Sequence, residues 1–212
     1  GGRHLGSTSH DFTWRLWDLE AQAELLQQEG HSAGTYGIAF HPDGSLACST
    51  GLDSYGRVWD LRSGKNVFIM RGHVQSVLST DWAPDGHTLV SAGDDNAVRV
   101  WDLRRRRCVY TIPAHTNLVS KVCFYRGSET GPFLVTASFD RTVKLWSMPD
   151  WTLAHTLVGH EKQVTSAAVS PDGTTIVSTS HDKTWKLWNI TDDADLMEDG
   201  DGREDVAPME TS

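Results

Sequence analysis

The chain has 212 residues, a size that fits one large domain or two small ones. Hydrophobic residues make up 38% and charged residues 22%, which is typical of a folded globular protein, and no apolar run reaches the roughly 18 residues of a membrane span. Nine of the 28 acidic side chains and one of the 19 basic ones fall within 191–212, so this segment carries almost all of the net charge of −9. We expect 191–212 to be an acidic disordered tail, and the near-neutral remainder lacks the basic excess of an autonomous nucleic-acid-binding domain.

One sequence unit recurs along residues 1–190 at intervals of 42 or 45 residues. Each unit holds a hydroxyl residue, then Asp four residues later, then Trp six residues after the Asp; the first copy is Ser7, Asp11 and Trp17. In the four later copies a His precedes the hydroxyl residue. We expect these copies to form structural tetrads: His31, Ser49, Asp53 and Trp59; His73, Ser91, Asp95 and Trp101; His115, Thr136, Asp140 and Trp146; and His160, Ser178, Asp182 and Trp188.

Turn signals divide each unit into short β-prone runs. Pro-Asp-Gly occurs at 42–44, 84–86 and 171–173, where Pro fixes φ, Asp bonds its own backbone and Gly adopts a positive φ. Each of these turns is predicted to join two antiparallel strands. In the unit that has the extra three residues, 126–132 replaces this turn, which predicts a longer hairpin there.

The segment 20–30 consists of good helix formers and favours a helix by propensity alone. Its place in the repeat matches 65–72 and 106–114, at the position of an outer strand. Since pairing within a sheet routinely overrides propensity, we predict an outer strand here.

These motifs resemble the WD-repeat β-propeller family, in which each blade is a four-stranded antiparallel sheet. The resemblance implies an all-β propeller over 1–190 with about five blades, of which the first lacks its inner strand and the last its outer strand. Seven blades are usual in the family, so it also implies the C-terminal part of a seven-bladed ring. The His, hydroxyl, Asp and Trp of each blade are expected to form a buried hydrogen-bonded network, which stabilises only when every member is satisfied.

An enzyme is disfavoured by the same repetition. Catalysis needs one exposed nucleophile, whereas here equivalent Asp, His and Ser sets recur in every unit. The chain has no Gly-rich phosphate loop, and its remaining histidines lack the spacing of metal ligands. We therefore expect no catalytic residue, no metal site, no cofactor and no small-molecule substrate.

The only cluster of basic residues is Arg104, Arg105, Arg106 and Arg107. One interpretation is a solvated turn that leads into an outer strand, which we expect for at least two of the four. The other is direct contact with RNA phosphates, because the guanidinium fork matches phosphate oxygens.

Loops at one face of a propeller commonly bind partners, and two series of loop residues are candidates here. One series directly precedes the repeat Asp, and the other follows the repeat His; ordinary loop variability is the alternative interpretation. The candidates are His10, Leu52, Asp94, Phe139 and His181, and Tyr36, Gln75, Asn117 and Lys162. The apolar Leu52 and Phe139 are expected at exposed loop tips, which favours protein binding.

Three stretches narrow the resemblance to the WD-repeat subunits of the U4/U6 small nuclear ribonucleoprotein. They are 13–21, 51–64 and 102–118, and the last has Pro-Ala-His where other units have Gly-His. The resemblance implies a nuclear, non-enzymatic scaffold of the U4/U6·U5 tri-snRNP that acts in spliceosome assembly and pre-mRNA splicing. It implies pre-mRNA-processing factor 3, a cyclophilin-type isomerase and U4/U6 snRNA as partners, with no membrane contact. The alternative is a WD-repeat adaptor that recognises peptides in a ubiquitin-ligase or chromatin complex.

Overall fold

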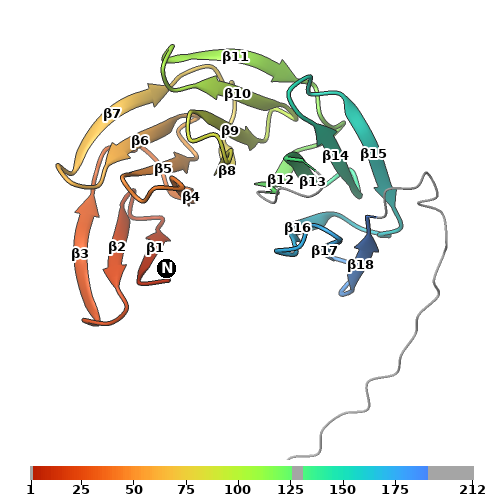
Figure 1. Cartoon of the computed structure of the whole chain (residues 1–212), viewed down its shortest axis with the longest axis horizontal. Coiled ribbons are helices and arrows are strands. Elements are labelled where there is room, and N and C mark those ends of the chain that lie inside the picture. The colour runs from red at the N-terminus through yellow and green to blue at the C-terminus, as the bar shows by residue number, and fades with distance from the viewer. Residues whose placement is uncertain (1, 126–130, 191–212) are drawn as a thin grey trace, which may run out of the picture.

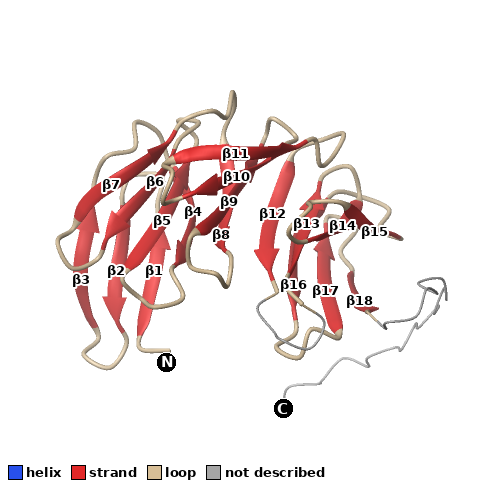
Figure 2. Cartoon of the chain, turned by 45° about the horizontal axis from the view of Figure 1, so that its top comes forward, coloured by secondary structure: helices blue, strands red, loops and turns tan. Residues whose placement is uncertain are grey.

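The computed structural model describes residues 2–125 and 131–190, which form strands, turns and loops (Figure 2). The predictions for most of the 126–132 hairpin and for the acidic tail lie outside the described residues. Within the described ranges, no helix is long and apolar enough to cross a membrane.

The described residues contain 18 strands, which form five antiparallel sheets. The first sheet consists of β1 (His4–Thr8), β2 (Trp14–Asp18) and β3 (Ala23–Gln28). The second consists of β4 (Thr35–Phe40), β5 (Leu46–Gly51), β6 (Gly56–Asp60) and β7 (Lys65–Met70). The third consists of β8 (Val77–Trp82), β9 (Thr88–Gly93), β10 (Val98–Asp102) and β11 (Arg107–Ile112). The fourth consists of β12 (Val119–Phe124), β13 (Phe133–Ser138), β14 (Thr142–Ser147) and β15 (Leu153–Val158). The fifth consists of β16 (Val164–Val169), β17 (Thr175–Ser180) and β18 (Trp185–Asn189).

The sheets stand side by side around an arc, with β4, β8, β12 and β16 on its inner side and β3, β7, β11 and β15 on its outer side (Figure 1). In every sheet, strands that are consecutive in sequence are hydrogen-bonded neighbours. Among the residues that the structure describes, the first and last sheets have three strands and the other three have four. The predicted all-β architecture of propeller blades is confirmed, with five blades in 2–125 and 131–190, the first and last of which have three strands there.

The segment of good helix formers is a strand. β3 pairs antiparallel with β2, with Trp14 opposite Gln28 and Leu16 opposite Leu26. Most of β3 is exposed, whereas Trp14 and Leu16 are buried. Pairing with a buried strand therefore decides the conformation of a segment that has little core of its own.

The three Pro-Asp-Gly turns each join the inner two strands of a sheet, as predicted. Gly44, Gly86 and Gly173 have φ of 79°, 70° and 75°, in the region that glycine adopts without steric cost. The backbone N–H of each glycine donates to the carbonyl three residues earlier, which closes a β-turn.

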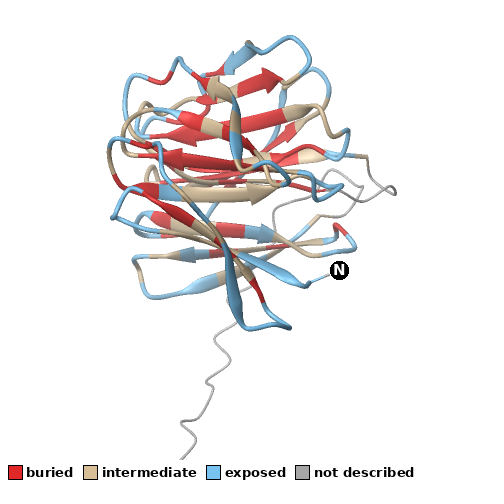
Figure 3. Cartoon of the chain, turned by 90° about the vertical axis from the view of Figure 1, so that its left-hand side faces the viewer, coloured by how far each residue is buried: buried red, intermediate tan, exposed pale blue. Residues whose placement is uncertain are grey.

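The apolar core lies between the sheets. Each cluster of buried side chains draws on two neighbouring sheets; one contains Cys48 and Val58 from the second sheet and Trp82 and Leu89 from the third. Figure 3 shows the buried segments in the middle of the stacked sheets and exposed segments toward the outer strands. Each sheet is thus stabilised mainly by its neighbours, as expected for a repeat architecture.

Side chains of the inner strands add hydrogen bonds across these interfaces. The N–H of Val122 in β12 donates to Oγ of Ser79 in β8 at 3.1 Å. The hydroxyl of Ser120 in β12 donates to the carbonyl of Val164 in β16 at 2.7 Å. Backbone ladders join strands within a sheet, and side-chain bonds of this kind join one sheet to the next.

Candidate functional site

The repeated polar residues meet inside the second, third, fourth and fifth sheets. In the third sheet, Nδ1 of His73 lies 2.8 Å from Asp95, and Nε2 of His73 lies 2.7 Å from Oγ of Ser91. The indole N–H of Trp101 donates to the same Ser91 oxygen at 2.8 Å. Since the carboxylate accepts only, Nδ1 carries the histidine proton, and the serine hydroxyl donates to Nε2 while it accepts from the indole. With the imidazole neutral, every polar group of the set has a hydrogen-bond partner.

The other three sets repeat this arrangement. His31, His115 and His160 each join a carboxylate to a hydroxyl at 2.8 to 3.0 Å. The corresponding tryptophans donate to the same hydroxyl oxygens at 2.8 to 3.0 Å. The structure therefore brings together all four residue types in each of the four predicted tetrads.

Burial sets the protonation of two of these histidines. Burial lowers the pKa of His31 and of His115 below the ordinary value of 6.5, although their carboxylate partners oppose the shift. Burial by itself would raise the pKa of Asp53, but hydrogen bonds from the Ser32 backbone and from His31 outweigh it and hold that pKa below its ordinary value. The paired groups are consequently a neutral imidazole and a carboxylate at neutral pH.

The first sheet has a reduced version of the network. The indole of Trp17 donates to Ser7 at 2.8 Å, as in the other sheets. Asp11, which has no histidine partner here, accepts from the backbone and hydroxyl of Thr13 instead. The hydroxyl–indole bond therefore forms without the histidine.

This geometry suits a structural role rather than catalysis. The hydroxyls of Ser49, Ser91, Thr136 and Ser178 belong to residues that are 0% exposed, so a substrate has no access to them. Among the described residues, no group of three or more His, Cys, Asp or Glu side chains is placed to hold a metal ion.

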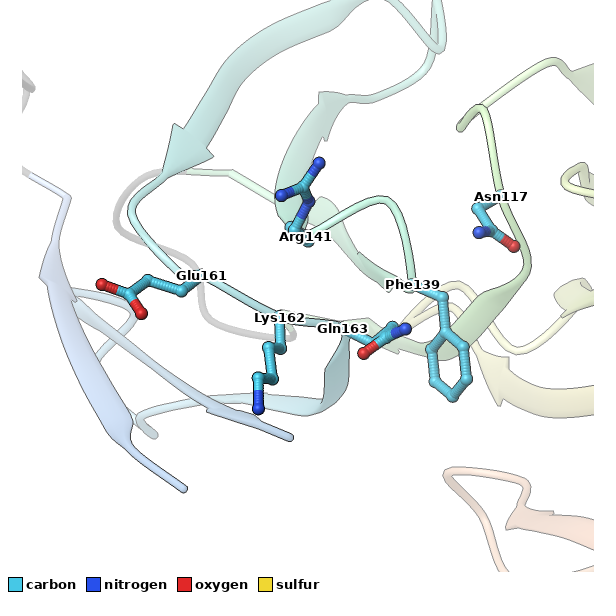
Figure 4. Close-up of a pocket in the computed structure, with 6 residues that line it drawn as sticks. All are labelled: Asn117, Phe139, Arg141, Glu161, Lys162 and Gln163. Carbon is cyan, nitrogen blue, oxygen red and sulfur yellow. The ribbon is translucent and has the colours of Figure 1, made fainter. Parts of the chain in front are cut away.

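A depression of about 320 Å³ lies where the loops of the fourth and fifth sheets meet (Figure 4). It brings together three of the candidate partner-binding residues, Asn117, Phe139 and Lys162. A fourth candidate, His181, lies beside it, with its ring edge-on to Phe139 at 5.7 Å between centroids. We call this depression the β12–β16 loop pocket.

Three further residues line the loop pocket and are absent from the sequence prediction: Arg141, Glu161 and Gln163. One of them occupies a fixed position in the repeat. Arg141 directly follows a repeat Asp, and the residue in that position has a positive φ in every sheet: Phe12, Ser54, Asn96, Arg141 and Lys183.

The expectation of two exposed apolar loop tips needs correction. Leu52 and Phe139 are both half-buried. The backbone N–H of each donates to a carbonyl of the adjacent loop, from Leu52 to Gly34 and from Phe139 to Leu118. These bonds join each loop to its neighbour, and both side chains are partly covered rather than fully exposed.

The other candidate loop residues belong to the first three sheets and do not line the loop pocket. Tyr36 is 54% exposed, and His10, Gln75 and Asp94 are exposed as well. None of these four residues, nor Leu52, is a lysine or an arginine.

The arginine cluster divides into two pairs. Arg104 and Arg105 lie 3.3 and 3.6 Å from a carboxylate oxygen of Asp102, which also accepts from both of their backbone N–H groups. Arg106 and Arg107 are exposed, and their side chains make no hydrogen bond or ion pair with any residue that the structure describes. Within the described residues, only the second pair has guanidinium groups without a carboxylate partner.

Comparison with known proteins adds a family pattern to this geometry. The pattern described as WD domain, G-beta repeat, matches 23–60, 64–102, 106–147 and 151–189, which is more than half of the chain. The matched segments correspond to the recurring unit that the sequence predicts.

Individual relatives match over shorter or weaker stretches. The chain is 62% identical to U4/U6 small nuclear ribonucleoprotein PRP4 of Saccharomyces cerevisiae over 29 residues, which are 14% of this chain and 6% of that relative. It is 50% identical to F-box-like/WD repeat-containing protein TBL1Y of Homo sapiens over 40 residues, which are 19% of this chain and 8% of that relative. It is 26% identical to WD repeat-containing protein 37 of Mus musculus over 167 residues, which are 79% of this chain and 33% of that relative. The chain thus spans a third or less of the length of each of these relatives.

Proposed function

The chain belongs to the WD domain, G-beta repeat family, and on that premise we propose that it is a scaffold subunit of the U4/U6·U5 tri-snRNP. Proteins of this family are generally non-catalytic scaffolds or adaptors, and the burial of the tetrad hydroxyls fits that role. In this proposal the protein acts in the nucleus, in spliceosome assembly and pre-mRNA splicing. Its partners are pre-mRNA-processing factor 3, a cyclophilin-type isomerase and U4/U6 snRNA.

The observation that carries the splicing assignment is the match of 62% identity to a protein named as a U4/U6 small nuclear ribonucleoprotein. The Pro113-Ala114-His115 block supports it, because this departure from Gly-His resembles the same subunit, pre-mRNA-processing factor 4. The structure accommodates the block without loss of the tetrad, since His115 still lies 2.8 Å from both Asp140 and Thr136.

An adaptor that recognises peptides is the second candidate. The match of 50% identity to a human protein whose name joins F-box-like and WD repeat supports it. Both candidates are scaffolds and both use loops to bind partners, so they differ in which molecules accompany the protein.

Affinity purification from nuclear extract, with the full-length protein tagged, separates the two candidates. We expect U4 and U6 RNA to be enriched over U1 RNA in the same extract, together with pre-mRNA-processing factor 3. Recovery of ubiquitin-ligase or histone-modifying subunits without these RNAs would contradict the splicing assignment and favour the adaptor.

Direct RNA contact is tested at the unpaired arginines. If Arg106 and Arg107 contact phosphates, Arg106→Gln with Arg107→Gln makes the negative slope of log K against log salt shallower by about 1.4, at roughly 0.7 per contact with single-stranded RNA. The matched control is Arg104→Gln with Arg105→Gln, which removes the same charge from side chains that Asp102 already holds. Equal slopes for the wild type and both double variants would eliminate this RNA contact.

A further inference from the structure

The outer strand of the third sheet combines basic groups with an exposed aromatic ring. β11 lies on the outer side of the arc (Figure 1) and begins at Arg107, directly after Arg106. Tyr110 follows three residues later and is 47% exposed. The corresponding outer strands, β3, β7 and β15, contain no exposed Phe, Tyr or Trp. This rim therefore has a chemistry that the other three outer strands lack.

The strand register puts Arg107 and Tyr110 on the same face of the sheet. Arg107 lies opposite Asp102 and Tyr110 lies opposite Val100 in β10, and a register shift between Val100 and Trp101 accommodates the extra residue of β11. Val100 and Asp102 are two residues apart, so they share one face, and residues directly opposite each other in an antiparallel pair share it too. The two residues are thus neighbours, roughly 7 Å apart along the strand.

The positive charge at this rim is not explained by the turn or by local pairing. Arg106 has φ of 51°, in the region that glycine adopts most readily, and Gly64 occupies the same position in the second sheet. Asp102 already lies against the first pair of arginines of the cluster. Four arginines against one aspartate leave a net charge of +3, and the second pair of guanidinium groups has no carboxylate partner among the described residues.

The Tyr110 ring is not part of the core. Ile112, on the same face of β11, is 2% exposed and belongs to the buried cluster between the third and fourth sheets, whereas Tyr110 lies outside that cluster. Within 2–125 and 131–190, its hydroxyl makes no hydrogen bond and its ring has no aromatic or cation–π partner. An exposed ring beside unpaired cations is typical of surfaces for single-stranded nucleic acids, where the cations follow the backbone and a base stacks on the ring.

We propose that this rim, formed by Arg106, Arg107 and Tyr110, binds a single-stranded segment of RNA. The two arginines hold phosphates, and one base stacks on Tyr110. The inference rests on the proposed splicing function and names the form of RNA that the basic cluster takes, because a base can stack on a side chain only when it is unpaired. A protein strand fits this edge less well, since exposed charged side chains and a bulge both oppose the addition of a strand.

The test is fluorescence anisotropy with the full-length protein that carries these residues. The labelled probes are a twelve-nucleotide oligouridine, a twelve-base-pair RNA duplex and inorganic polyphosphate. Tyr110→Leu removes the ring and no charge, so it should weaken oligouridine binding by about tenfold or more, as expected for the loss of one stacked base, while the salt slope stays the same. Polyphosphate has no bases and should bind wild type and Tyr110→Leu equally. The duplex should bind wild type more weakly than oligouridine does.

Two control variants keep the result interpretable. Tyr110→Phe retains the ring and should retain the affinity for oligouridine within about twofold. Tyr36→Leu removes another exposed tyrosine, 54% exposed on the inner strand β4, and should leave the affinity unchanged.

The outcomes separate this inference from the proposed function. Equal binding of oligouridine to wild type and Tyr110→Leu, an equal loss of polyphosphate binding, or a duplex that binds as tightly as the single strand would overturn the stacking site. Polyglutamate that binds through Tyr110 where oligouridine does not would overturn it in favour of a protein partner. Recovery of U4 and U6 RNA from extract is read independently, so the scaffold proposal can hold while this site fails, and the reverse.

Discussion

The third and fourth sheets have the same hydrogen-bonded network in their interiors but different residues in their loops. Both place His, a hydroxyl residue, Asp and Trp in one network, with His–Asp distances of 2.8 Å in each. At the loop end, the third sheet has Asp94 and Asn96 where the fourth has Phe139 and Arg141. One backbone unit therefore supports opposite surface chemistry, and the predictions below test how far the interior and the loops are independent.

The interior should be the sensitive part. Trp101 is 2% exposed and donates to Ser91, so Trp101→Ala is expected to lower the free energy of unfolding by about 3–5 kcal/mol through the cavity it leaves. Trp185 is 65% exposed on β18, and Trp185→Ala should change it by no more than about 0.5 kcal/mol. Urea titration of each variant measures both changes, and similar losses in the two would show that the interior network is not what stabilises the sheets.

The next largest loss in the free energy of unfolding is expected when the shared hydroxyl is removed, and it should be greater in a complete tetrad than in the reduced network of the first sheet. Ser91→Ala leaves the Trp101 indole and His73 without their shared partner and should cost about 1–3 kcal/mol. Ser7→Ala removes only the bond from Trp17, at a half-buried position, and should cost about 0.5–1.5 kcal/mol. The same urea titrations decide the order, and a larger loss for Ser7→Ala would contradict the role assigned to the histidine.

Acid should weaken the interior through its histidines. The pKa of His31 and of His115 is lower in the folded chain than the ordinary 6.5, so the unfolded chain binds more protons once the pH falls to about 6.5. The stabilisation is complete above that value and is lost progressively as the pH falls toward the folded pKa values. Urea midpoints from pH 8 to 5 should decline, and His115→Gln, which cannot titrate, should flatten the decline; an unchanged slope would count against this origin.

The smallest effect is expected at the loops, where the two sheets differ most. Arg141→Asn should raise the free energy of unfolding by about 0.5 kcal/mol, because asparagine fits the left-handed backbone better. The reciprocal Asn96→Arg, at φ of 63°, should lower it by a similar amount. Differential unfolding of the two variants checks the pair. Opposite signs from those expected would show that the Arg141 side chain has a stabilising contact of its own.

The sequence alone was sufficient for the interior because the same residues recur at fixed spacing. Periodicity placed each tetrad, and it also overrode the helix propensity of the segment that forms β3. The sequence was insufficient to predict which loop residues lie together, because this depends on the directions of the loops and their side chains more than on spacing along the chain. Asn117, Phe139 and Lys162 were correctly grouped as loop residues, but nothing in the repeat indicates that they share a pocket with Arg141.

The half-burial of Leu52 and Phe139 shows the same limit. Both were expected at exposed tips, since each is an apolar residue next to a turn. The bond from the Phe139 N–H to the Leu118 carbonyl and the contact of its ring with His181 depend on how neighbouring loops meet. Such contacts arise from tertiary geometry, which a single unit of sequence does not encode.

Side-chain hydrogen bonds such as those of Ser79 and Ser120 join neighbouring sheets, while the ladders stay within each one. Adding or deleting one whole unit therefore recreates the same kind of junction without shifting any strand register. Duplication of a gene segment encoding a single unit can lengthen such a protein in complete steps, and each new copy brings its own loops for mutation to reshape.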